Sequence, residues 1–191
     1  ATAYVNDTID LVTVRIDVSP SNATEENGQL VYTVKLVDAG GAEVILPAGK
    51  TVTATLNWSG VAGASDIYSV NGTPGAGLPT TVTIAGGTGH TYITVIPQDD
   101  YFKEGRESLI ATVSAPVDTN SVFEAVGVKT GGDVATGYIV DETQDLDGAG
   151  PGSTLAGGTA DSIYVRVDVS PTNATEESGQ LVYTVKLVDA G

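Results

Sequence analysis

One segment of this 191-residue chain occurs twice with almost no change. Residues 15–40 read RIDVSPSNATEENGQLVYTVKLVDAG, and residues 166–191 read RVDVSPTNATEESGQLVYTVKLVDAG. The differing pairs, all mild, are Ile16/Val167, Ser21/Thr172 and Asn27/Ser178. Self-similarity at a fixed offset indicates a chain built from repeated structural units. The offset of 151 residues (166 − 15 = 151) therefore predicts a tandem array with that period.

A second, weaker similarity within the sequence indicates where the units begin and end. The beginning of the chain, ATAYVNDTIDL, resembles ATGYIVDETQDL at 135–146. The stretch that follows is rich in Gly and Ala and has no periodicity, which is typical of a linker. The alternative to a tandem array is a coincidental duplication within one domain. The predicted organisation is the last strand of a preceding repeat at 1–6, a complete domain at 10–143, a Gly-rich linker at 144–160 and the first two strands of the next repeat at 161–191.

Apolar and polar residues alternate along most of the complete unit. In TVTATLNW, apolar residues at 52, 54, 56 and 58 alternate with Thr and Asn, and QLVYTVKLV alternates in a similar way. A period of two is typical of strands with one buried face. Turns rich in Pro and Gly, such as LPAGK and NGTPGAGLP, separate these runs. We therefore expect an all-β, Ig-like antiparallel β-sandwich of seven or eight strands, with Trp58 as a core anchor.

The charge of the chain excludes several classes of partner. The net charge is −16, and only eight residues are Lys or Arg. Nucleic acids and anionic membranes would be repelled by such a chain. The sequence also lacks an apolar run of about twenty residues, so we expect no membrane insertion in this segment. Because there is no cysteine, disulfides and zinc–thiolate sites are impossible.

Acidic residues gather where the expected strands end. They are Glu25, Glu26, Asp66, Asp99, Asp100, Glu104, Glu107, Asp141, Glu142, Asp145 and Asp147. Loops that follow alternate strands of an antiparallel sandwich meet at one pole, which would collect these carboxylates. Calcium takes about six to eight oxygen ligands, whereas one histidine and no cysteine leave little for transition metals. We predict a Ca²⁺ site at this pole; the alternative is a set of solvated loop acids that keep the protein soluble.

The order of several motifs resembles that of a Calx-beta-like domain. The motifs are ATEENGQLVYTVKL, SDIYS, TVTIAGG, TYITVIPQDDYFKEGRESLIATVSA and ATGYIVDET, and they span most of residues 15–143. With its tandem organisation, the chain is similar to the extender repeats of giant calcium-dependent, RTX-type adhesins of Gram-negative bacteria. The resemblance implies calcium-stabilised repeats that hold a distal binding domain away from the cell during adhesion and biofilm formation. It also implies an extracellular location on the bacterial cell surface, with neighbouring repeats of the same chain as partners.

The resemblance further implies a set of calcium ligands. Carried over by motif, the candidates are Glu25, Glu26, Asp66, Asp99, Asp100, Glu104, Asp141 and Asp145. Asp10 and Asp161 occupy equivalent junction positions, where they are expected to bridge to a neighbouring repeat. The sequence departs from the family pattern at Ile67, which separates Asp66 from Tyr68, and in its terminal acids, which read DETQDLD instead of a tight triplet.

Other functions have weaker support in the sequence. His90 is the only histidine and no G-x-S-x-G motif is present, so we do not expect an enzyme. A calcium-dependent sugar- or protein-binding module of a surface or matrix protein is the main alternative. The sequence also contains N-glycosylation patterns such as NAT and NWS, so a eukaryotic matrix protein is a further alternative. Residues 161–191, as part of an unfinished sandwich, are expected to pair with a neighbouring copy or to be partly disordered.

Overall fold

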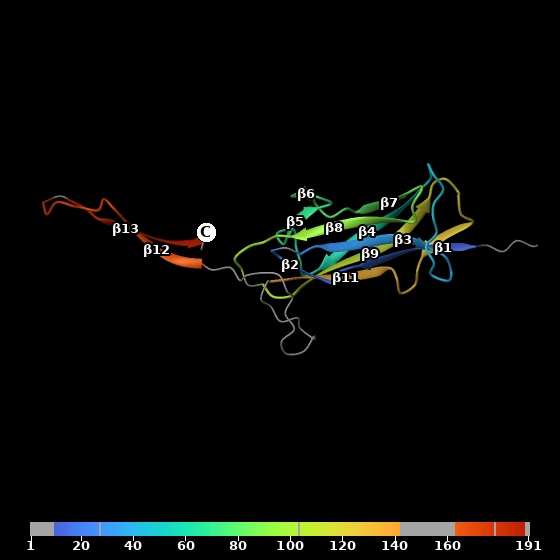
Figure 1. Ribbon diagram of the computed structural model, residues 1–191, viewed down its shortest axis with the longest axis horizontal. Coiled ribbons are helices and arrows are strands. Elements are labelled where there is room, and N and C mark those ends of the chain that lie inside the picture. The colour runs from blue at the N-terminus through green and yellow to red at the C-terminus, as the bar shows by residue number, and fades with distance from the viewer. Residues whose placement is uncertain (1–9, 27, 103, 142–162, 178, 190–191) are drawn as a thin grey trace, which may run out of the picture.

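The computed structural model describes residues 10–26, 28–102, 104–141, 163–177 and 179–189. Within these ranges every regular element is a β-strand: two sheets pack face to face, and a separate hairpin follows them (Figure 1). The predicted all-β sandwich is therefore confirmed. Among the same residues, no helical segment has the length and hydrophobicity that a membrane span requires.

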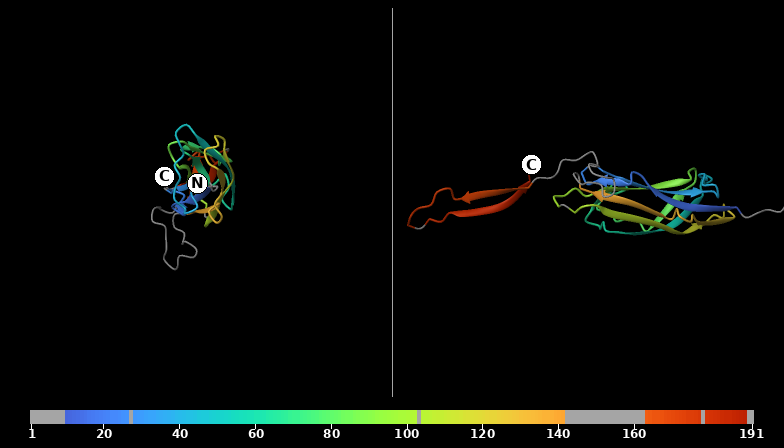
Figure 2. Two further views of the ribbon diagram at one scale, coloured as in Figure 1. Left: turned by 90° about the vertical axis from the view of Figure 1, so that its right-hand side faces the viewer. Right: turned by 90° about the horizontal axis from the view of Figure 1, so that it is seen from below.

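Each sheet of the sandwich is made of strands that are distant in the sequence. The six-stranded sheet has the order β10 (Ala125–Val128), β1 (Leu11–Val18), β3 (Leu30–Val37), β8 (His90–Pro97), β5 (Ile67–Val70) and β6 (Thr73–Pro74). The five-stranded sheet has the order β2 (Asn22–Thr24), β11 (Val134–Val140), β9 (Glu107–Asp118), β4 (Thr51–Gly60) and β7 (Thr81–Ala85). Figure 2 shows the two layers from a second direction.

The pairing differs from the expected purely antiparallel pattern at two sheet edges. β10 pairs in parallel with β1, and β2 pairs in parallel with β11. The described part of the sandwich also has more strands than the seven or eight expected, because β2, β6 and β10 are only two to four residues long. Strands this short carry too few residues for a period of two to be visible in the sequence.

The core lies between the sheets and is filled by the inward-facing residues of the alternating runs. On β3, Leu30, Tyr32, Val34 and Leu36 are all completely buried, as the alternation predicts. On β4, Val52, Ala54 and Leu56 face inward and are buried. Trp58 follows them in the same alternation but is only partly buried. Its ring meets the ring of Tyr32 edge-on at 5.0 Å. Trp58 therefore packs against the core, as predicted, but at its end.

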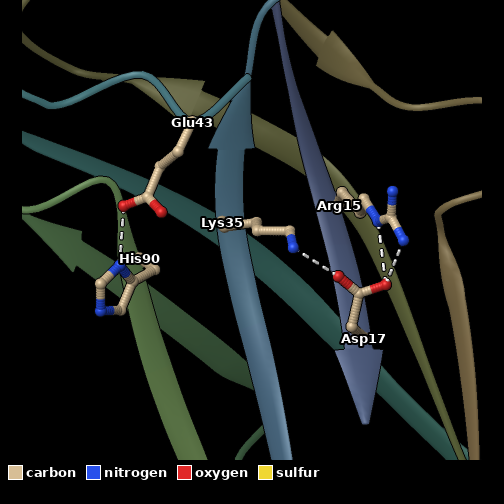
Figure 3. Close-up of polar contacts among 5 residues, drawn as sticks. All are labelled: Arg15, Asp17, Lys35, Glu43 and His90. Atoms are coloured by element: carbon tan, nitrogen blue, oxygen red, sulfur yellow. Dashed lines mark hydrogen bonds and ion pairs between the residues drawn. The ribbon is translucent and has the colours of Figure 1, made fainter. Parts of the chain in front are cut away.

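The hairpin of β12 (Ile163–Ser170) and β13 (Val182–Asp189) repeats the pairing of β1 with β3. Arg166 lies opposite Lys186 just as Arg15 lies opposite Lys35. In the sandwich, Asp17 binds Arg15 at 2.6 Å and Lys35 at 2.7 Å (Figure 3). The corresponding Asp168 makes the same two ion pairs in the hairpin, each at 2.7 Å. The repeated sequence thus dictates the same register and the same charged face in both copies.

The two copies differ in what covers their apolar face. Val34 and Leu36 are completely buried in the sandwich, whereas the corresponding Val185 and Leu187 are 66% and 70% exposed. A hairpin supplies only one layer of a sandwich, so its inward-facing side chains have no second layer to pack against. In Figure 1 and in the right-hand view of Figure 2 the hairpin lies beyond the end of the sandwich. The predicted segment at 1–6 and the linker at 144–160 lie outside the described residues.

Candidate metal centre

Three carboxylates converge at one end of the sandwich. Asp66 directly precedes β5 in one sheet, and Glu107 is the first residue of β9 in the other. Glu104 lies three residues before β9 in the loop that leaves β8. One carboxylate oxygen from each of Asp66, Glu104 and Glu107 lies within 4.8 Å of the others. We call these three side chains the carboxylate cluster, and the end of the sandwich that holds them the acidic pole.

Backbone hydrogen bonds bring the two loops of the cluster together. The Gln98 N–H donates to the carbonyl of Asp66 at 2.9 Å, which joins the end of β8 to the start of β5. The N–H groups of Val61 and Ala62 donate to the carbonyl of Ser108 at 2.9 and 3.1 Å. The loop that carries Asp66 is therefore fixed against the beginning of β9, the strand that carries Glu107.

Asp66 is held as a charged group. The Gly63 N–H donates to one carboxylate oxygen at 2.5 Å, and the Ser65 hydroxyl donates to the other at 2.7 Å. Partial burial acts to raise the pKa of Asp66, but these bonds, together with one from Glu107, hold it below the usual range. The fixed carboxylate is thus ready to bind a cation.

Glu107 shows the opposite behaviour. Burial is the largest cause that raises the pKa of Glu107 to about 7, followed by its hydrogen bond to Asp66 and the charges of Asp66, Glu104 and Asp141. Its Oε2 atom is buried without a hydrogen-bond partner in the part of the chain that the structure describes. A buried acceptor in this state costs free energy unless a proton or a cation compensates it.

Two further acids surround the cluster. Burial and then the charges of Asp66, Asp100 and Asp141 raise the pKa of Glu104. Asp141 is buried, and the N–H groups of Glu104 and Gly105 approach its two carboxylate oxygens at 3.4 Å each. The Asp100 carboxylate accepts a hydrogen bond from the Phe102 N–H at 2.7 Å. Asp100 and Asp141 therefore shape the loop and add negative charge beside the three converging groups.

The other predicted ligands are not part of the carboxylate cluster and lie in different parts of the chain. Glu25 is buried after β2, and its N–H donates to the carbonyl of Val140, so its backbone lies beside Asp141. Glu26 and Asp99 are exposed. Asp10 precedes β1 and donates its N–H to Glu124 at the opposite end of the sandwich. Asp145 and Asp161 lie outside the described residues. The roles of all these residues remain predictions.

Glu107 is the member that the expected ligand set omitted. The sequence places it among the acids at strand ends, three residues after Glu104, but the ligand set carried over by resemblance includes Glu104 and not Glu107. Its importance comes from position: β9 begins at Glu107, and its carboxylate turns toward Asp66 of the opposite sheet. The E-x-x-E spacing before an apolar strand was the available signal.

The donor set fits a hard divalent cation. All the converging atoms are carboxylate oxygens, which calcium prefers, and the buried Oε2 of Glu107 is an acceptor that such an ion would satisfy. The single histidine is remote from the cluster, because His90 begins β8 at the other end and its Nδ1 lies 2.7 Å from Glu43 (Figure 3). The donor atoms therefore suit a hard divalent cation better than zinc or copper.

Comparison with known proteins finds solved structures that align with part of this chain at low identity. No protein-family model matches the sequence, and no curated protein matches it. A crystal structure of CBD12 from CALX1.2 aligns with 67% of this chain at 17% identity and a TM-score of 0.45, and the chain spans 45% of that structure's length. The apo form of the Calx CBD1 domain aligns with 67% of this chain and 96% of its own, at 16% identity and a TM-score of 0.43.

The Calx CBD2 domain aligns with 68% of this chain and 87% of its own, at 11% identity and a TM-score of 0.42. Similarity at this level does not assign a function to this chain. The interpretation of the site therefore rests on the geometry and electrostatics of its own carboxylates.

Proposed function

We propose that this chain is a calcium-binding β-sandwich repeat whose role is structural. The observation that carries the proposal is that one carboxylate oxygen from each of Asp66, Glu104 and Glu107 lies within 4.8 Å of the others, and a buried oxygen of Glu107 has no hydrogen-bond partner among the described residues. These three residues would hold the ion, with Asp100 and Asp141 adding negative charge beside it. A bound Ca²⁺ would supply the positive charge that this group of acids otherwise lacks.

The chain's own residues prepare the site before any ion arrives. The Gly63 N–H and the Ser65 hydroxyl fix Asp66, while Asp141 accepts from the loop that carries Glu104. The loops from the two sheets are thereby held close enough for one ion to contact both. Binding to the native state alone stabilises that state by mass action, so calcium is expected to stabilise the sandwich.

The wider role that we propose is that of an extender in a tandem array on the surface of a bacterial cell. The repeated segment with its repeated register supports an array of similar sandwiches in which neighbouring repeats are the partners. In such an array the repeats would hold a distal binding domain of an adhesin away from the cell and serve in adhesion and biofilm formation. Asp10 and Asp161 remain candidates for contacts at the junctions, and Asp145 remains a candidate ligand. We assign the chain no catalytic role.

Isothermal titration calorimetry tests the calcium proposal. CaCl₂ titrated into chain that has been stripped with EDTA is expected to give saturable heat, and melting of the sandwich is expected to move to higher temperature. MgCl₂ serves as the matched ion, because Mg²⁺ demands a stricter octahedral geometry and dehydrates reluctantly. No saturable heat with CaCl₂ and no change of melting temperature would overturn the proposal.

Small-angle X-ray scattering tests the extender role on a tandem protein of several complete repeats. The maximum dimension is expected to grow in proportion to the number of repeats in calcium, and to shorten in EDTA as the junctions gain freedom. A dimension that is the same in both solutions would contradict a calcium-dependent extender while leaving calcium binding itself intact.

A further inference from the structure

A hollow opens at the end of the core, beside the carboxylate cluster but separate from it. Its volume is about 310 Å³, and its larger walls are Trp58 of β4, Ile67 of β5, Leu78 and Leu109. The remaining wall is built mainly of Gly and Ala at 60, 62–64 and 75–77. Because these residues have almost no side chain, the space between the two sheets stays open at this point.

Trp58 is fixed in the wall of this hollow. Its Nε1–H donates to the carbonyl of Pro79 at 2.8 Å, and its ring meets Tyr32 edge-on in the core. An indole that is held by one hydrogen bond and one ring contact does not need to reorganise when a ligand arrives. A preformed apolar wall of this kind lowers the entropic cost of binding.

The lining residues define the chemistry of the ligand. Among the described residues that form the hollow, none is charged, and the side-chain polar groups are the Ser59 hydroxyl and the indole N–H that already donates to Pro79. A charged ligand would lose its hydration there without gaining a partner of opposite charge among these residues. The volume is at the lower end of the range for small-molecule pockets, which are concave and mostly apolar.

We propose that this hollow is a binding site for a small, neutral, largely apolar molecule of about one or two rings, which packs against Trp58. The site goes beyond a structural role, because a calcium-dependent spacer does not require it. Ala62 lies in its wall, and the same loop continues through Gly63, which lines the hollow and also donates to Asp66 of the carboxylate cluster. Occupancy of the hollow is thereby linked to ion binding, and this link rests on the proposed function.

Binding of the neutral probe N-phenyl-1-naphthylamine to the full chain tests the site. Trp58 is the only tryptophan, so its emission reports a probe that arrives beside it. We expect saturable enhancement of probe emission together with quenching of Trp58. Ala76→Phe, which fills the hollow from its wall, is expected to weaken binding by roughly tenfold or more. Ala48→Phe adds the same ring on an exposed turn at the other end of the sandwich and should leave binding unchanged.

Two results would overturn the site. One is the absence of saturable binding. The other is binding of equal strength in Ala76→Phe with Trp58 emission unaffected, which would place the probe elsewhere, as on the exposed apolar face of the β12–β13 hairpin. If Ala76→Phe does not melt cooperatively, the smaller Ala62→Val on another part of the wall takes its place with the same expectation. Titrations in CaCl₂ and in EDTA test the link: different affinities support it, and equal affinities remove it while the pocket itself stands.

Discussion

Asp66, just before β5 of one sheet, and Glu107, the first residue of β9 in the other, share a hydrogen bond, and their environment moves their pKa values in opposite directions. Asp66 is held charged by the Gly63 N–H and the Ser65 hydroxyl, whereas Glu107 retains its proton up to about pH 7. The pair therefore contains one fixed negative charge, on Asp66, and a second, on Glu107, that appears only as the pH rises through about 7. A cation is the natural compensation for both.

Replacement of Glu107 by Gln tests this arrangement directly. Gln is nearly isosteric but has one carbonyl oxygen and no charge, so calcium affinity is expected to fall by roughly tenfold or more. In EDTA the same change removes repulsion from the cluster and should leave the melting temperature equal or higher. Titration calorimetry and thermal melting measure the two effects.

Glu124→Gln is the matched control, because Glu124 lies at the opposite end of the sandwich beside Asp10. It should leave calcium affinity unchanged. Equal affinities for the wild type and Glu107→Gln would show that Glu107 does not contact the ion.

The raised pKa of Glu107 predicts how stability depends on pH without calcium. The ordinary value is 4.5 and the folded value is about 7, so between these limits the folded state binds the proton and the unfolded state has released it. Glu107 therefore makes the free energy of unfolding decrease as pH rises through this range, and makes no further change above it. Calcium is expected to abolish the decrease because the ion replaces the proton.

Melting temperatures from about pH 5 to pH 8 in EDTA, for the wild type and Glu107→Gln, measure this effect. Carboxyls with lowered pKa values, such as Asp17 and Asp118, act at lower pH and in both proteins alike, so the difference between the two curves isolates Glu107. Parallel curves would contradict the assignment.

The repeat supplies a matched pair for testing the core. Leu36 and Leu187 occupy the same position in the two copies, but one is completely buried and the other is 70% exposed. Leu36→Ala is expected to lower the free energy of unfolding by about 2–5 kcal/mol, because it opens a cavity in a closed core. Leu187→Ala should change it by less than about 0.5 kcal/mol. Urea denaturation followed through Trp58 measures both, and comparable losses would mean that the hairpin is packed in solution.

Tyr32 tests a buried polar contact in the same core. Its hydroxyl donates to the carbonyl of Leu109 at 2.6 Å, and the side chain is completely buried. Tyr32→Phe leaves that carbonyl without this donor and should cost about 1–3 kcal/mol. Tyr68→Phe, at a tyrosine that is 48% exposed, is the control and should be close to neutral in the same urea experiment. A similar effect at both positions would show that the Tyr32 bond contributes little.

The fold class and the repeat could be read from the residues, whereas part of the pairing could not. Alternation over β3 and β4 reports which side chains face inward, because side chains of a strand alternate between its two faces. The parallel edge pairs of β2 and β10 were missed, since their few residues carry no periodic signal and their position depends on where other strands leave room. Pairing between distant segments is a property of the assembled sheets.

For the site, the sequence by itself determined which atoms were available: many carboxylates at strand ends, one histidine and no cysteine, hence oxygen ligands for a hard cation. Only the tertiary structure decided which carboxylates meet. It brought Glu107 to Asp66 across the two sheets and left Asp10 at the far end, because the order of strands in the sheets determines which loops share a pole. It also opened the hollow beside Trp58, since a cavity arises where packed layers fail to fill space, and local sequence does not record that.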